Sequence, residues 1–138
     1  MTRRIAPVAI VALALALALA PAALAGKNGG KPSGSGSSSL SLVLMDGATQ
    51  AAHYGRITFD VKTTATKPQV GLRCYQGSSF VYDGYVGYWP EYMFDPWFTL
   101  QSNYWVDGVW ATCYARLFYN DRRGNQIVLA TTSFPVAP

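Results

Sequence analysis

Histidine is nearly absent from this 138-residue chain, and charged residues are scarce. His53 is the single histidine, there are two cysteines, and Lys, Arg, Asp and Glu together make up 13% of the sequence. These residues do not supply the four ligands of a structural zinc site, so we expect no metal and no other cofactor. The basic residues are not clustered as a nucleic-acid surface requires, so no nucleic-acid partner is expected.

The sequence also lacks the patterns of common hydrolases. No serine lies in a Gly-x-Ser-x-Gly motif, and a bridged cysteine could not serve as a nucleophile. A glycosidase needs two carboxylates at a defined separation, and the spacing of the acidic residues in the aromatic region selects no pair. The acids considered are Asp83, Glu91, Asp95 and Asp107. We therefore expect that the protein is not an enzyme.

The first 25 residues have the pattern of an export signal. Arg3 and Arg4 precede an apolar run over residues 8–20, and Ala23-Leu24-Ala25 provides the small-x-small site that a signal peptidase cleaves. The Ala/Leu-rich run resembles signals of high-G+C bacteria. We expect cleavage after Ala25 and a secreted, extracellular protein that meets the membrane only during export, by the general or the twin-arginine route. The alternative is an uncleaved membrane anchor.

Residues 26–39 are expected to form a flexible Gly/Ser/Lys linker before a single domain over residues 40–138. The linker contains no apolar side chain except Pro32, so it cannot bury enough surface to offset its ordering entropy. It either separates the signal from the fold or tethers the domain to a cell-surface layer. Two of the 11 basic residues lie in the signal, which leaves nine against seven acidic residues.

Apolar residues beyond the linker recur with a period of two, and no window shows a helical repeat. Period two is the spacing of half-buried β-strands. Gly77-Ser78-Ser79 is expected to connect a hairpin, and residues 120–125 are expected to form a turn. The expected strands are 40–44, 57–64, 70–75, 80–86, 97–101, 109–119 and 127–134. About seven strands with turns between them predict an all-β antiparallel sandwich.

Cys74 and Cys113 both fall on the apolar face of their expected strands. In an exported chain two such residues predict one disulfide, which closes a loop worth about 4 kcal/mol in the chain-entropy model. Two free thiols in the core are the alternative.

The two cysteines, with Trp110 three positions before the second, resemble a bacterial secreted immunoglobulin-like domain. The resemblance covers residues 40–138 and implies an immunoglobulin-like sandwich. It differs from true immunoglobulin domains because Cys74 falls on the third expected strand, not the second, and because Ala111 replaces the tyrosine two positions before the second Cys. It implies no functional residues, since such domains share no chemistry.

Residues 80–105 contain 11 of the 19 aromatic side chains. Prolines and glycines within this stretch indicate that much of it is not regular strand. Aromatic rings on loops suit the recognition of sugars or peptides, whereas rings in the core or over a sheet edge would be structural. The candidate ligand-binding residues are Trp89, Tyr92, Trp97 and Trp105, and the first two are expected to project on a loop.

The sequence therefore predicts a secreted, non-catalytic binding or structural module that acts through residues 80–105. Its partner would be an extracellular carbohydrate or protein. One alternative is a small secreted glycan-active enzyme or inhibitor. Another is a surface component that associates with itself through an exposed strand edge.

Overall fold

A computed structural model describes residues 37–138, and this part of the chain is all-β. The expectations for the signal peptide (1–25), and for all but the end of the linker (26–39), lie outside the described residues. The strands are β1 (Ser39–Leu44), β2 (Arg56–Lys62), β3 (Gln69–Gln76), β4 (Ser79–Gly87), β5 (Phe98–Thr99), β6 (Ala111–Asn120) and β7 (Gln126–Val136). The predicted strands are confirmed within a few residues at their ends.

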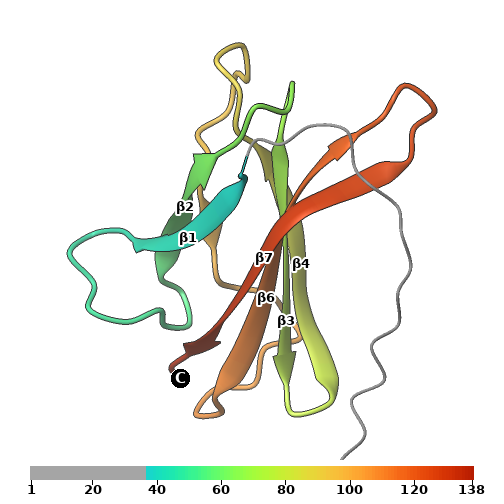
Figure 1. Cartoon of the computed structure of the whole chain (residues 1–138). Coiled ribbons are helices and arrows are strands. Elements are labelled where there is room, and N and C mark those ends of the chain that lie inside the picture. Colours follow the sequence, from blue (N-terminus) through green and yellow to red (C-terminus); the bar gives the residue numbers. More distant parts are fainter. Residues whose placement is uncertain (1–36) are drawn as a thin grey trace, which may run out of the picture. The chain divides into compact units, whose positions relative to one another are not determined.

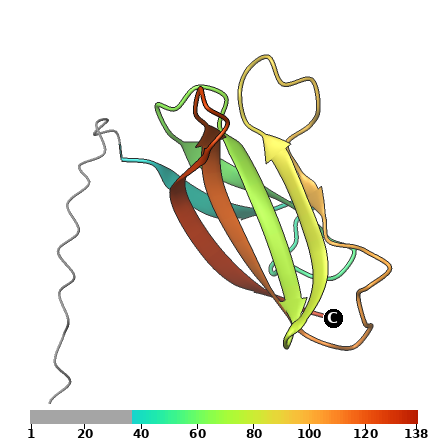
Figure 2. The same ribbon diagram turned by 90° about the vertical axis from the view of Figure 1, so that its right-hand side faces the viewer.

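The strands form two antiparallel sheets that face one another (Figures 1 and 2). One sheet has three strands in the order β1-β2-β5, and the other has four in the order β4-β3-β6-β7. The turn between β3 and β4 is short because Gly77 adopts a positive φ of 60°. The β6–β7 hairpin extends beyond the neighbouring strands (Figure 1).

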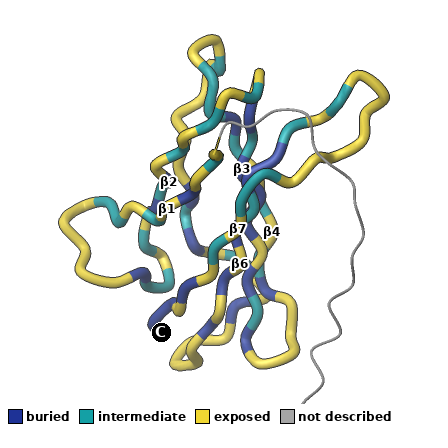
Figure 3. The backbone as a smooth tube through the Cα atoms, in the orientation of Figure 1, coloured by how far each residue is buried: buried dark blue, intermediate teal, exposed yellow. Residues whose placement is uncertain are grey.

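The core lies between the sheets because apolar residues alternate along each strand. Ile57 and Phe59 of β2 and Val70 and Leu72 of β3 are all buried and belong to one hydrophobic cluster. The buried positions lie mainly on the strands, while the connecting segments are largely exposed (Figure 3). The period-two pattern therefore identifies the inner face of each sheet.

The disulfide between Cys74 and Cys113 is present and joins two strands of the same sheet. Cys74 lies directly opposite Cys113 in the β3–β6 pairing. Both sulfurs are fully buried beneath the four-stranded sheet. The bridge thus ties β3 to β6 and does not connect the two sheets.

One local expectation was wrong. Val109 was expected on the inner face of the long strand, but it is exposed and β6 begins two residues later. Trp110, the residue directly before β6, is exposed too. The strand expected over residues 80–86 is confirmed, since β4 contains Gly84 and ends at Gly87.

Candidate functional site

Trp89 and Tyr92 lie together on the loop between β4 and β5, but they do not project freely. Their ring centroids are 4.7 Å apart and both side chains are half-buried. They fold back over Gly87, where an added Cβ would lie 2.3 Å from the Trp89 ring and 2.7 Å from Tyr92. Gly87 thus allows these rings to pack against the end of β4.

The same loop is held at its base by Tyr88. Its hydroxyl donates to the carbonyl of Pro96 over 3.0 Å, and its backbone N–H donates to the carbonyl of Pro68 over 2.9 Å. Burial raises the pKa of Tyr88, so the phenol stays protonated at ordinary pH and remains a donor. A hollow of about 370 Å³ opens between this loop and residues 63–68, with Lys67 on its lining.

Trp97 and Trp105 occupy opposite environments. Trp97 is 37% exposed, and the Arg56 guanidinium lies 5.6 Å from the centroid of its ring. Trp105 is only 8% exposed and stacks on the imidazole of His53, with centroids 4.8 Å apart. Of the four rings expected to bind a ligand, Trp105 is therefore in the core, because His53 covers it.

The His53 side chain is buried in an aromatic stack. Its ring is stacked between Tyr54 and Trp105, and its side chain is 5% exposed. Nδ1 lies 3.2 Å from a carboxylate oxygen of Asp107, while Nε2 is buried without a hydrogen-bond partner in the described part of the chain. A general base would need a nucleophile within hydrogen-bond reach of that free nitrogen.

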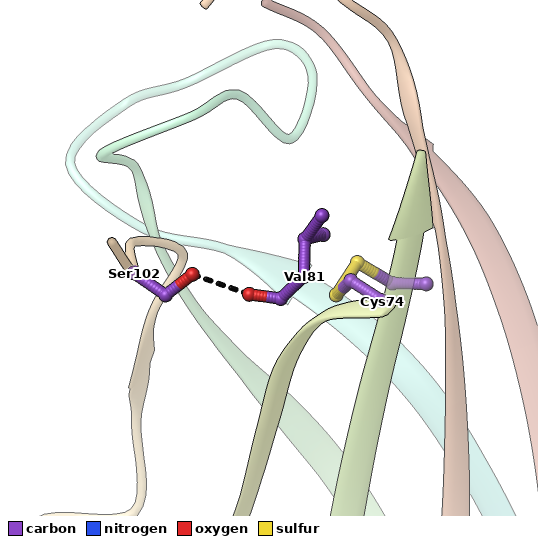
Figure 4. The surroundings of a disulfide bond; sticks show 4 residues. Cys74, Val81 and Ser102 are labelled. Atoms are coloured by element: carbon purple, nitrogen blue, oxygen red, sulfur yellow. Dashed lines mark hydrogen bonds between the residues drawn. A yellow bond between two sulfur atoms is a disulfide. The ribbon is translucent and has the colours of Figure 1, made fainter. Parts of the chain in front are cut away.

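The segment after β5 is fixed to the end of β3 and to the edge strand β4. The buried Gln76 amide donates to the carbonyls of Val106 and Val109, and it accepts from the Val106 N–H, each over 2.8 Å. The Ser102 hydroxyl donates to the Val81 carbonyl beside the disulfide (Figure 4). These bonds explain why residues 101–110 have a defined path without being a strand.

A second group of aromatic side chains lies on the outer face of the four-stranded sheet. We define this outer face by the residues of β3, β4, β6 and β7 that alternate with the buried ones. The Tyr75 ring lies between Phe80 and Tyr114, with centroids 5.7 and 6.1 Å away. Phe80 is 48% exposed and Tyr114 54% exposed, so an apolar patch is open to solvent.

Beside this patch the outer face is hollowed to a volume of about 610 Å³. Gly71 forms part of the lining, and a Cβ there would lie 3.3 Å from Nε of Arg116, so the guanidinium end of Arg116 extends over Gly71. Hydroxyl-bearing side chains of β7 border the opposite side. The lining residues are Gly71, Arg73, Tyr75, Tyr114, Ala115, Arg116, Thr131, Thr132 and Ser133.

The two arginines of this groove differ in their electrostatic surroundings. Nε of Arg73 donates to a carboxylate oxygen of Asp83, the residue opposite it on β4, over 3.2 Å. Arg116 forms no ion pair with any residue in the described range, and its guanidinium carbon lies 5.7 Å from the Phe118 ring centroid. The groove therefore holds one neutralised cation and one uncompensated cation.

None of the four expected ligand-binding rings lies on this groove. The sequence pattern that could have identified this groove is the set of outward-facing residues in the two strands that carry the cysteines. Arg73 and Tyr75 flank Cys74, and Tyr114 follows Cys113, so aromatic and basic side chains face away from the disulfide on both strands. A solvent-facing tyrosine and arginine pair on adjacent strands is an informative exposed feature.

No protein-family model, curated protein or solved structure matches this chain. Within residues 37–138 there is no helix with the length and hydrophobicity needed to cross a bilayer. The same range contains no group of three or more His, Cys, Asp or Glu side chains that could hold a metal ion.

Proposed function

We propose that this protein is an exported, non-catalytic binding module whose ligand lies on the outer face of the four-stranded sheet. The observation that carries the proposal is the groove of about 610 Å³ beside the exposed rings of Phe80 and Tyr114. Its volume is in the range of ligand sites, and aromatic and polar groups converge on it. Large aromatic side chains give contact area at low entropic cost.

Part of the aromatic stretch 80–105 contributes to this surface. Phe80, Asp83 and Tyr85 of β4 pair with Tyr75, Arg73 and Gly71 of β3 across the outer face.

The Trp89 and Tyr92 loop serves the fold, since both rings pack on Gly87.

Export is supported by two independent features. The first 25 residues have the charged start, apolar run and small-residue site of a signal peptide. The disulfide between Cys74 and Cys113 suits an oxidising compartment outside the cytoplasm. The proposed site of action is the cell exterior.

The strand order supports a sandwich of the immunoglobulin-like type. The sheets β1-β2-β5 and β4-β3-β6-β7 correspond to A-B-E and C′-C-F-G in that nomenclature. The disulfide differs, since it joins the C-like and F-like strands within one sheet.

A glycan-active enzyme is a weaker proposal. The groove lining contains no carboxylate, and the neighbouring Asp83 is held by Arg73. A glycosidase would need two carboxylates facing one another across the groove.

The test is a binding screen of the purified protein against polysaccharides and cell-wall fractions. Tyr114→Ala should weaken binding about 30-fold, equivalent to about 2 kcal/mol, while the melting temperature changes little. Tyr104→Ala is the control, because Tyr104 is also an exposed tyrosine but lies on the segment after β5.

Binding that survives Tyr114→Ala but is lost on Trp89→Ala would move the site to the loop between β4 and β5. Binding that appears only as concentration-dependent self-association would support the strand-edge alternative instead.

A further inference from the structure

We propose that the ligand of the outer face is a carboxylate-bearing polysaccharide, with Arg116 as the residue that binds the carboxylate. This inference rests on the proposed function, because it assigns a ligand class to the same groove. Three features support it, namely the uncompensated guanidinium of Arg116, the combination of exposed rings with hydroxyl groups, and the balance of charge in the described residues.

The first feature is the position of Arg116. Its aliphatic part and Nε lie over Gly71, and its guanidinium is near the Phe118 ring, so the side chain is oriented along the surface of the sheet. A guanidinium presents paired N–H donors that match the two oxygens of a carboxylate. No carboxylate occupies this position within the described residues, whereas Arg73 is already paired with Asp83.

The second feature is the combination of rings and hydroxyls. Tyr114 lies between Arg73 and Ser133 in the strand register, and Arg116 lies between Gly71 and Thr131. A sugar ring can place its C–H face on an aromatic ring while its hydroxyls bond to Ser, Thr and Tyr side chains. A polymer of sugar acids supplies both the apolar ring faces and the carboxylates, whereas a chain of glycerol phosphates has no ring to stack.

The third feature is the balance of charge. Four of the 11 basic residues precede residue 37, which leaves seven basic and seven acidic residues in 37–138. Overall charge therefore does not attract a polyanion, and the preference must come from the groove itself. The same local charge disfavours a second copy of the chain as the occupant, since a symmetric pair would bring the Arg116 side chains together.

The experiment compares polygalacturonate with its methyl ester, because esterification removes the charge and keeps the sugar chain. The protein should bind polygalacturonate at least about tenfold more tightly than the ester, and added salt should reduce the difference. Alginate and hyaluronate serve as further probes with other linkages. Polyglycerol phosphate is the ring-free polyanion.

Arg116→Gln should reduce binding of polygalacturonate about tenfold, to the level of the ester, and leave binding of the ester unchanged. Arg116→Lys keeps the charge but loses the paired donors, so its affinity should be intermediate. Arg123→Gln is the matched control, because it removes the same charge at the exposed tip of the β6–β7 hairpin. Thermal melting confirms that each variant is folded.

Equal, Tyr114-dependent binding of the ester and the acid would overturn the carboxylate proposal and leave the binding function intact. So would equal losses from Arg116→Gln and Arg123→Gln, or Arg116-dependent binding of polyglycerol phosphate. Failure to bind any of the three uronate polymers would overturn the inference as well. The binding function itself fails only if neutral polysaccharides and cell-wall fractions also do not bind.

Discussion

The outer face of the four-stranded sheet and the loop between β4 and β5 are both rich in aromatic side chains, yet they use them differently. On the outer face, Phe80 and Tyr114 are open to solvent on strands whose backbone groups pair within the sheet. On the loop, Trp89 and Tyr92 cover Gly87 and each other. The rings on the outer face are therefore available to a ligand, whereas the rings on the loop stabilise the path of the chain.

The difference follows from how each segment satisfies its backbone. Strand residues form ladder hydrogen bonds, so the outward side chains are not needed for local order. A loop of ten residues has no ladder and depends on side chains for a fixed path. Here the Tyr88 hydroxyl and the packed rings provide that support. Aromatic content alone therefore does not identify a binding surface.

Removal of the disulfide should have the largest effect and should separate the two regions. The Cys74→Ala/Cys113→Ala variant should lose about 4 kcal/mol of unfolding free energy, because the bridge closes a loop of 39 residues. Tyr75 and Tyr114 each follow one of the cysteines, so ligand binding at the outer face should weaken too. Denaturant unfolding measures the first effect, and a binding titration below the melting temperature measures the second.

The NMR signals of Trp89 should change little in the same variant, because that loop is anchored by Tyr88 and Gly87 away from the bridge. Two alkylatable thiols in the native wild-type protein would show that Cys74 and Cys113 are not bridged. Unchanged stability in the double variant would contradict the energetic argument.

The strands were predictable from the sequence because their signal is local. Ile57, Phe59 and Val61 alternate with polar residues, as Val70, Leu72 and Cys74 alternate with theirs, and a strand places such residues on one face. The position of Cys74 on the third strand was predictable from the same alternation. The pairing within one sheet did not follow, since alternation reveals the face of a residue and not its neighbouring strand.

The exposure of each aromatic ring depends on segments distant in the sequence. Trp105 is buried because His53, from the segment before β2, stacks on it. Tyr114 is exposed because no third layer covers the outer face in the described structure. Nothing close to either residue in the sequence distinguishes these outcomes, which explains why Trp105 was expected to be a binding residue and Tyr114 was not singled out.

Truncation of a core ring should cost more than truncation of an outer-face ring. Trp105→Ala should lose about 3–5 kcal/mol of unfolding free energy, because a large buried side chain leaves a cavity. Tyr114→Ala should lose about 1 kcal/mol or less, the size of a cross-strand side-chain pair. Denaturant unfolding of both variants measures the contrast, and similar losses would show that the outer face is part of the packed core.

Two glycine variants compare the regions more finely. Gly87→Ala should cost about 1–3 kcal/mol, because its Cβ would overlap the Trp89 ring at 2.3 Å and displace it. Gly71→Ala should change stability by less than about 1 kcal/mol, since its closest contacts are at 3.3 Å and one is the flexible Arg116 side chain. Thermal melts give the stabilities, and the indole NMR signal of Trp89 reports the displacement. A neutral Gly87→Ala would show that the loop rings are not packed on β4.

The smallest expected effect is a pH dependence confined to the loop side of the molecule. Hydrogen bonds from Arg56 hold the pKa of Asp46 below its usual range, and the same guanidinium lies over Trp97. A carboxyl group with a lowered folded-state pKa contributes stability above its unfolded pKa, and that contribution is lost as the pH falls through the folded value. On acidification the Trp97 indole signal should therefore shift in NMR spectra as Arg56 is released.

Asp46→Asn should abolish this shift, because the side chain at position 46 no longer titrates. The pair is exposed, so the change in stability should be small. A shift that persists in Asp46→Asn would mean that another acid controls Trp97, and the contrast between the two regions would then not extend to their response to pH.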